Sequence, residues 1–168
     1  MILYLDCDGV ILDTIEACYK LMRDEGLNDK DKNIVHEYFL NVDWNYLIYR
    51  AGVLNNSIIN IKNIIESNKF NDVIILTKIS GNLGEEKCKR ILFSKLLPDV
   101  KVLAVPYDMN KNDFVDPKGN VLVDDEMKNV LKWIYAGGIG IYYVRNNPNY
   151  ELNEIDNLKN LNKTKGLR

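Results

Sequence analysis

The sequence predicts an α/β fold, a doubly wound (Rossmann-like) parallel sheet with a small helical cap inserted after the first strand. Three observations lead to this prediction. Short, almost continuous apolar runs recur along the chain, helical patterns lie between them, and a long helical segment follows the first run. Parallel strands that are covered on both faces give continuous apolar runs, and their alternation with helices is typical of a doubly wound sheet.

The predicted strands are rich in β-branched and aromatic residues. They are Ile2–Leu5, Val73–Leu76, Val100–Val105, Val121–Val123 and Ile139–Val144. Two helices separate later strands. Glu85–Leu97 carries apolar residues at helical spacing and stops before Pro98, and Glu126–Ala136 stops at Gly137-Gly138, as glycine after a helix predicts.

Residues 11–70 interrupt this alternation with four helical patterns. The patterns cover Ile15–Glu25, Ile34–Phe39, Trp44–Ala51 and Ile58–Asn68. The segment is too long for one crossover helix, so we predict that residues 11–70 form a small helical cap over the end of the first strand. The core then comprises residues 1–10 and 71–161, and residues 162–168 are expected to be a flexible tail.

Composition favours a soluble globular protein and disfavours several classes of partner. Among the 168 residues, 46% are hydrophobic and 27% are charged, which suffices for one buried core. The net charge of −2 gives no basic face, so we expect no long nucleic acid as partner. No apolar run approaches the roughly 20 residues of a membrane span, so we expect no membrane partner. Three cysteines without metal or disulfide spacing favour a reduced, cytoplasmic setting.

Polar side chains follow the carboxyl ends of the predicted strands. They are Asp6, Asp8, Thr77, Lys111, Asp124 and Asp125. Parallel strands bring their carboxyl ends to one edge of the sheet, so these residues are expected to meet in one crevice. Two carboxylates at alternate positions, Asp6 and Asp8, repel each other unless a cation or a proton compensates them. The pattern therefore predicts a magnesium-assisted reaction centre.

The order of these motifs resembles the haloacid dehalogenase-like (HAD) phosphohydrolase superfamily. The matches are Asp6-Cys7-Asp8-Gly9-Val10, Leu76-Thr77, Lys111 and Val123-Asp124-Asp125, spread over residues 2–125. The helical insert resembles the cap of many members. More narrowly, Ile75-Leu76-Thr77, Lys111-Asn112-Asp113-Phe114, Leu122-Val123-Asp124-Asp125 and the Lys-rich helix that ends at Pro98 look like the 5′(3′)-deoxyribonucleotidase branch.

The resemblance implies a role for each catalytic candidate. Asp6 would attack phosphorus and form an aspartyl-phosphate intermediate. Asp8 would protonate the leaving oxygen and later accept a proton from the attacking water. Thr77 would donate its hydroxyl to a phosphate oxygen, and Lys111 would offset the negative charge. The helix that opens at Asn82–Glu85 would favour an anion at its N-terminus.

It also implies a Mg²⁺ site and substrate contacts. Asp6 and Asp124 fit as carboxylate ligands, the Asp8 backbone carbonyl fits as a third ligand, and Asp125 would hold a metal-bound water or position Lys111. Gly9, Lys78 and Trp44 are the residues expected to contact the substrate. Trp44 belongs to a dense group of aromatic residues in the insert, where flat rings could stack on a nucleobase.

Several alternatives stay open from the sequence. The pair Asp124-Asp125 is also suited to cap the helix that begins at Glu126, which is compatible with metal binding. Lys118 is nearer to Asp124 in sequence and competes with Lys111 as the catalytic lysine. Most cap aromatics could equally form the cap's own core.

We therefore expect a Mg²⁺-dependent phosphomonoester hydrolase that acts on a small phosphorylated metabolite, with a 5′-nucleotidase for (deoxy)nucleoside monophosphates as the leading interpretation. A phosphatase for a sugar phosphate is the nearest alternative, and one for polynucleotide ends is disfavoured by the acidic charge balance. A catalytically silent nucleotide-binding regulator is a further alternative, although it would need neither a nucleophile nor an acid. The sequence leaves the oligomeric state open.

Overall fold

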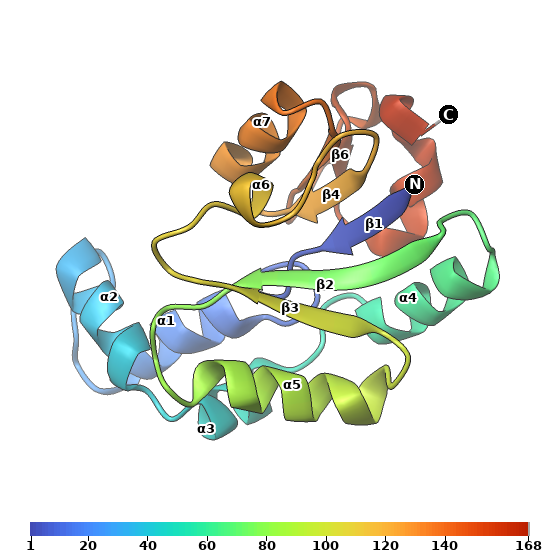
Figure 1. Cartoon of the computed structure of the whole chain (residues 1–168). Coiled ribbons are helices and arrows are strands. Elements are labelled where there is room, and N and C mark those ends of the chain that lie inside the picture. Colours follow the sequence, from blue (N-terminus) through green and yellow to red (C-terminus); the bar gives the residue numbers. More distant parts are fainter. Residues whose placement is uncertain (168) are drawn as a thin grey trace.

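A computed structural model describes residues 1–167 and confirms the predicted fold class (Figure 1). One six-stranded sheet has the order β3-β2-β1-β4-β5-β6, and every paired strand is parallel. The strands are β1 (Ile2–Leu5), β2 (Asp72–Lys78), β3 (Lys101–Val105), β4 (Val121–Asp124), β5 (Ile139–Tyr143) and β6 (Glu154–Ile155). Chain order reverses on either side of β1, so the crevice for a ligand is expected at the carboxyl ends of β1 and its neighbours.

The α-helices lie on both faces of the sheet and in the segment after β1. They are α1 (Thr14–Asp24), α2 (Lys32–Asn41), α3 (Trp44–Ala51), α4 (Ser57–Glu66), α5 (Glu85–Leu96), α6 (Lys111–Phe114) and α7 (Met127–Tyr135). Figure 1 shows α4 and α5 on one side of the sheet and α7 on the other. Within the described part of the chain, no helix is both long and apolar enough to cross a membrane.

The alternation of side chains along β1 shows how the two faces are filled. Leu3 and Leu5 belong to the larger buried cluster, which also takes Phe93 from α5, whereas Tyr4 packs edge-to-face on Trp133 of α7. Successive residues of a strand point to opposite faces of the sheet. The side chain of Asp6 is therefore expected on the same face as that of Tyr4, away from the larger cluster. The strand thus delivers its first carboxylate to the sheet edge instead of into the main core.

The segment predicted as the cap contains helices with two different environments. A separate apolar cluster joins α1 and α3 through Cys18, Leu21, Met22, Trp44 and Leu47. By contrast, Ile61 of α4 is fully buried in the larger cluster beside the strands. Helix α4 therefore serves as the crossover between β1 and β2, and the domain division at residues 11 and 70 stays a prediction.

The end of the chain differs from the expected flexible tail. Strand β6 was missed; the 3₁₀ turn Tyr150–Leu152 precedes it, and the 3₁₀ turns Leu158–Lys163 and Lys165–Leu167 follow it. Thr164 is fully buried, and Lys69 Nζ donates hydrogen bonds to Asn162 Oδ1 and the Leu167 carbonyl. The polar composition of residues 162–167 misled the prediction because these polar groups bond within the turns and to neighbouring segments, as the Thr164 hydroxyl does to the Leu161 carbonyl; residue 168 lies outside the described residues.

Candidate active site

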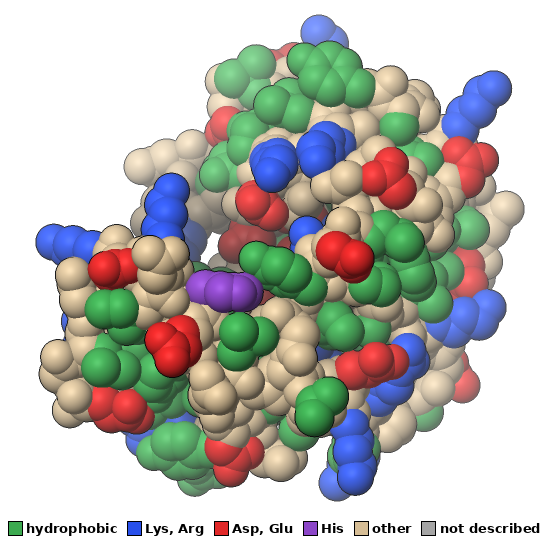
Figure 2. Space-filling view, turned by 60° about the vertical axis from the view of Figure 1, so that its left-hand side comes forward, with side chains coloured by type: hydrophobic (Ala, Val, Ile, Leu, Met, Phe, Trp, Pro, Cys, Tyr) green, Lys and Arg blue, Asp and Glu red, His purple; other side chains and the backbone are tan. Residues whose placement is uncertain are grey.

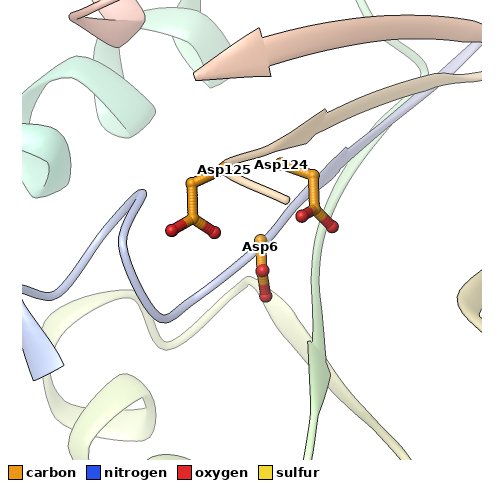
Figure 3. Close-up of side chains that lie close together, drawn as sticks. All are labelled: Asp6, Asp124 and Asp125. Carbon is orange, nitrogen blue, oxygen red and sulfur yellow. The ribbon is translucent and has the colours of Figure 1, made fainter. Parts of the chain in front are cut away.

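Three aspartates from two neighbouring strands meet at the carboxyl edge of the sheet (Figure 3). Asp6 directly follows β1, Asp124 is the last residue of β4, and Asp125 comes next. The Asp6 amide donates a 2.9 Å hydrogen bond to the Val123 carbonyl, which fixes the two strand ends together. One oxygen of each of the three carboxylates lies within 4.8 Å of the others, so the group could hold a metal ion.

Lys111 reaches the same acids from the first turn of α6. Its Nζ lies 2.8 Å from Asp6 Oδ1 and 2.7 Å from Asp124 Oδ2, and its side chain is 2% exposed. Lys118, the competing lysine, is exposed in the turn before β4. The structure thus brings Lys111 and not Lys118 to the acids, and the salt bridges of Lys111 go to Asp6 and Asp124 rather than to Asp125.

Burial and mutual repulsion shift the protonation of these groups. Burial raises the pKa of Asp6 well above its usual value, Lys111 lowers it, and the neighbouring Asp124 and Asp125 raise it further. Burial, followed by the charge of Asp124, raises the pKa of Asp125 to about 7. Burial lowers the pKa of Lys111, but Asp6 and Asp124 raise it above the ordinary lysine value, so Lys111 stays charged. The three carboxyl groups therefore resist full ionisation even with Lys111 beside them.

Asp8 is held apart from the three-aspartate cluster. The Thr14 hydroxyl at the start of α1 donates a 2.6 Å hydrogen bond to Asp8 Oδ1, and Thr77 Oγ1 lies 3.3 Å from Asp8 Oδ2. A second buried lysine, Lys89 of α5, forms a salt bridge to Asp8 Oδ2. The Asp8 side chain is therefore turned to hydrogen-bond donors and lies outside the candidate metal group, while the expected role of its backbone carbonyl stays a prediction.

Sequence reasoning missed Lys89, Glu85 and Thr14. Lys89 Nζ lies 2.6 Å from Glu85 Oε1, and both side chains are almost fully buried. The predicted apolar stripe of this helix contains Cys88 and Ile91, yet Ile91 is 46% exposed in the structure. The stripe that faces inward is Glu85, Lys89 and Phe93. Their i, i+4, i+8 spacing was visible in the sequence, but charged residues at such spacing usually mark a solvated helix face.

The loop between β2 and α5 uses its polar groups internally. The Ser80 amide donates a 2.6 Å hydrogen bond to Glu85 Oε2. Asn82 Nδ2 donates to the carbonyls of Leu40, in the last turn of α2, and of Val42, which follows α2. The first turn of α5 thus carries its own carboxylate. We therefore find no support in this loop for the expected anion site at the N-terminus of α5.

Two adjoining cavities open at the acids, and Figure 2 shows the hollow with acidic side chains inside it and the purple side chain of His36 at its edge. They share Asp8, Ile15, Lys78 and Glu126. The acidic cavity, of about 420 Å³, also contains Asp6, Lys111 and Asp125. The aromatic cavity, of about 300 Å³, contains Phe39, Trp44 and Tyr107.

The three residues expected to contact the substrate have different surroundings. Lys78 lines both cavities, with its Nζ 5.5 Å from the centre of the Tyr107 ring. Trp44 lines the aromatic cavity but is only 3% exposed, because its ring packs in the α1–α3 cluster. Gly9 lies below Asp125: a Cβ added to Gly9 would stand 2.0 Å from Asp125 Oδ2. Gly9 thus leaves room for a carboxylate.

We predict that Gly9→Ala disrupts the three-aspartate cluster. Gly9 has a positive φ of +77° and its added Cβ would collide with the Asp125 carboxylate, so the variant should lose Mg²⁺ affinity and stability together. Gly26→Ala is the matched control, because Gly26 has a φ of +75° with no atom near the added Cβ. Melting curves with and without Mg²⁺ should show a metal-dependent gain in Gly26→Ala and none in Gly9→Ala; equal gains would contradict the assigned role of Gly9.

We also predict a pH-dependent stability that Asp125 causes in the metal-free protein. The folded pKa of about 7 lies above the ordinary value of 3.8, so between these values the folded chain keeps a proton that the unfolded chain has lost. The free energy of unfolding should therefore fall as the pH rises through this interval. In EDTA, the melting temperature of the wild type should fall relative to that of Asp125→Asn from pH 5 to 8, and added Mg²⁺ should reverse the trend. A constant difference would contradict this prediction.

Comparison with known proteins supports the fold. No protein-family model matches the chain, and no curated protein matches it in sequence. Among solved structures, a haloacid dehalogenase-like family hydrolase from Xanthomonas campestris matches with a TM-score of 0.52 and 12% sequence identity. The match covers 95% of this chain and 92% of that chain. At this level of identity the likeness establishes a shared architecture: the chain has the fold of a HAD-like hydrolase over almost its whole length.

Proposed function

We propose that this protein is a Mg²⁺-dependent phosphomonoester hydrolase of HAD type, with Asp6 as the nucleophile. The observation that carries the proposal is that Asp6, Asp8, Lys111 and Asp125 line one cavity, although they come from different strand ends. The buried Asp124 and Thr77 contact this group, through Lys111 and Asp8 respectively. The HAD-like fold supports it, because the motifs that resemble this superfamily are the residues that converge.

The donor set of the three-aspartate cluster fits a divalent cation. Mg²⁺ prefers hard oxygen ligands, and carboxylates with raised pKa values gain most from a nearby positive charge. Asp6, Asp124 and Asp125 would hold the ion. When bound, it would neutralise charge on the phosphate and on the acids around it.

The proposed reaction has two displacements. An Asp6 oxygen attacks phosphorus as the ester P–O bond breaks, and Asp8 gives its proton to the leaving oxygen. Asp6 Oδ1 already accepts the Cys7 amide at 2.7 Å and the Lys111 ammonium, so we assign the attack to Oδ2. Water then attacks phosphorus, Asp8 takes its proton, and the bond from phosphorus to Asp6 breaks. This step releases phosphate and restores the Asp6 carboxylate and the protonated Asp8.

Thr77 and Lys111 support these steps through charge and hydrogen bonding. Thr77 is fully buried at the end of β2, and its hydroxyl is placed beside Asp8, where it could donate to a phosphate oxygen. Lys111 keeps its positive charge between Asp6 and Asp124 and so lowers the repulsion between an anionic nucleophile and an anionic substrate.

For the substrate, we propose a nucleoside or deoxynucleoside monophosphate. The phosphate would lie in the acidic cavity and the base in the aromatic cavity, against the rings of Phe39 and Tyr107. Tyr107 extends this wall through a 5.1 Å ring contact with His36 of α2. Flat rings beside a phosphate site suit stacking on a base.

The substrate proposal predicts a specific effect of Tyr107→Leu. Loss of stacking should raise the KM for nucleoside monophosphates roughly 2- to 12-fold, whereas the inhibition constant of inorganic phosphate should not change. Tyr135→Leu is the matched control, since Tyr135 on α7 is 85% exposed. An unchanged KM, or equal changes for nucleotide and phosphate, would contradict base stacking on Tyr107.

The experiment that tests the proposed function is phosphate release from a panel of substrates with Mg²⁺ and with EDTA. The panel holds 5′- and 3′-(deoxy)nucleoside monophosphates, sugar phosphates, p-nitrophenyl phosphate and an oligonucleotide with a terminal phosphate. We expect metal-dependent turnover that is highest for nucleotides. Preference for a sugar phosphate or an oligonucleotide end would move the substrate to that alternative, and a folded protein that binds nucleotides without turnover would be a regulator.

A further inference from the structure

Lys89 is a fully buried charged side chain that the proposed reaction does not use. It lies in α5, and its Nζ contacts Asp8 Oδ2, Glu85 Oε1 at 2.6 Å and Thr77 Oγ1 at 3.0 Å. The ring of Trp44 covers it at 4.8 Å. An ammonium group without solvent is unfavourable unless it is fully paired, so this pairing needs a reason.

The contacts use the whole hydrogen-bonding capacity of Lys89. A lysine ammonium has three N–H donors and no acceptor, and Asp8, Glu85 and Thr77 provide three acceptors. No donor is left over for a phosphate oxygen. Lys89 thus differs from a phosphate-binding lysine. It can affect the reaction only through the residues that it contacts, Asp8, Glu85 and Thr77.

Glu85 fixes Lys89 in turn. Its Oε1 accepts from Lys89, and its Oε2 accepts from the Ser80 amide at 2.6 Å and also from the Ser80 hydroxyl. Both carboxylate oxygens are therefore held, one by the lysine and one by the loop after β2. The lysine has no freedom to follow Asp8 if Asp8 moves.

Asp8 is clamped between this lysine and the cap. Lys89 holds Oδ2, and the Thr14 hydroxyl holds Oδ1 at 2.6 Å. The two buried lysines divide the acids between them: Lys111 pairs with Asp6 and Asp124, and Lys89 pairs with Asp8 and Glu85. An acid that must reach the leaving oxygen in one step and water in the next depends on such fixed geometry.

We propose that Lys89, braced by Glu85, is a positioning residue that holds the Asp8 carboxyl group for proton transfer to the leaving oxygen. The proposal rests on the proposed phosphatase function. It assigns the Glu85–Lys89 pair a task in the reaction rather than in folding alone. Lys89 also donates a hydrogen bond to the Thr77 hydroxyl oxygen, so the hydroxyl proton of Thr77 must point away from Lys89.

The test compares two leaving groups in Lys89→Met. A nucleoside monophosphate needs a proton on its leaving alkoxide, whereas p-nitrophenolate departs without one, and kcat/KM covers the reaction up to this departure. We expect kcat/KM to fall about 10²-fold or more for the nucleotide and less than about 10-fold for p-nitrophenyl phosphate. Asp8→Asn should show the same asymmetry, and adding Lys89→Met to it should cause little further loss.

Two further variants keep the test decisive if Lys89→Met unfolds. Glu85→Gln/Lys89→Met removes the Glu85 charge together with the lysine, so of the two carboxylates that Lys89 pairs with, only Asp8 loses its cation, and the variant should show the same leaving-group asymmetry. Lys95 is an exposed lysine in the last turn of the same helix. Lys95→Met should therefore leave kcat/KM unchanged for both the nucleotide and p-nitrophenyl phosphate. Circular dichroism spectra establish that the compared variants are folded.

The outcomes separate this proposal from the proposed function. An active wild type whose folded variants lose equal factors on both substrates would overturn the positioning role alone, because a structural defect does not distinguish leaving groups. Additive losses in the Asp8→Asn background would overturn it as well. A wild type that turns over neither ester would overturn the phosphatase function, and the role of Lys89 with it.

Discussion

Replacing Asp6 by Asn is expected to lower phosphatase activity by about 10⁴-fold or more, the largest effect of any single substitution in this chain. The amide keeps the shape of the side chain and its hydrogen bond from the Cys7 amide but cannot attack phosphorus. Because the covalent intermediate forms on this side chain, no other residue can take over the step. The measurement is kcat with the best substrate of the panel at saturating Mg²⁺.

The control for this loss is the same change at an exposed position of α1, Asp24→Asn. It should keep wild-type activity. A folded Asp6→Asn variant that retains more than about one tenth of the activity would contradict the nucleophile assignment and would direct attention to direct attack by water.

Lys111→Met is expected to have the second largest effect, a loss of activity of about 10²–10³-fold. Lys111 is the cation that touches both Asp6 and Asp124, so its removal leaves two buried carboxylates facing each other. Breaking a buried ion pair by removing one partner costs about 3–5 kcal/mol, which for a chain of this size corresponds to roughly 2–4 °C per kcal/mol in the melting temperature. Both activity and melting temperature should therefore fall.

The matched control is Lys118→Met, the lysine that the sequence alone leaves as a competitor. Lys118 is exposed in a turn, and its removal should change neither quantity. Mg²⁺ should recover part of the stability of Lys111→Met, because the cation compensates the same carboxylates, but not its activity. If Lys118→Met were the inactive variant, the placement of the catalytic lysine would be wrong.

The fold was predictable because its strands are buried on both faces. Continuous apolar runs such as Ile2–Leu5 leave little choice of structure, and β1 has these bounds in the structure. Strand β6 was missed because Glu154–Ile155 has only two residues. The turns that follow bury only isolated apolar residues, Leu158 and Leu161, in the larger cluster, and the Gly166 amide donates to Asn153 Oδ1, so no apolar stripe marks them in the sequence.

The acids of the site were predictable for a topological reason. Asp6, Thr77 and Asp124 stand at the ends of parallel strands, and such ends meet at one edge whatever the loops do. Lys89 and Glu85 could not be found this way. They lie inside a helix, and only packing of α5 against the loop after β2 and against Trp44 decides that this charged pair faces inward.

Trp44 illustrates the limit of reasoning from composition. An aromatic-rich insert suggests stacking on a substrate, but the same rings can fill the cap. The structure gives Trp44 both surroundings, since its ring packs on Lys89 and in the α1–α3 cluster while one edge lines the aromatic cavity. Tyr107, which lines the cavity from the loop after β3, carried no sequence pattern that singled it out.

The central claim is that Asp6 carries the phosphoryl group during turnover, and one measurement tests it most directly. Wild-type protein with Mg²⁺ is mixed with a substrate that carries a radioactive phosphate, quenched in acid within one turnover, and digested for mass spectrometry. We predict a labelled peptide whose phosphoryl group is on Asp6, and no label on Asp6→Asn. Turnover without labelled protein, or a label on another residue, would contradict the account.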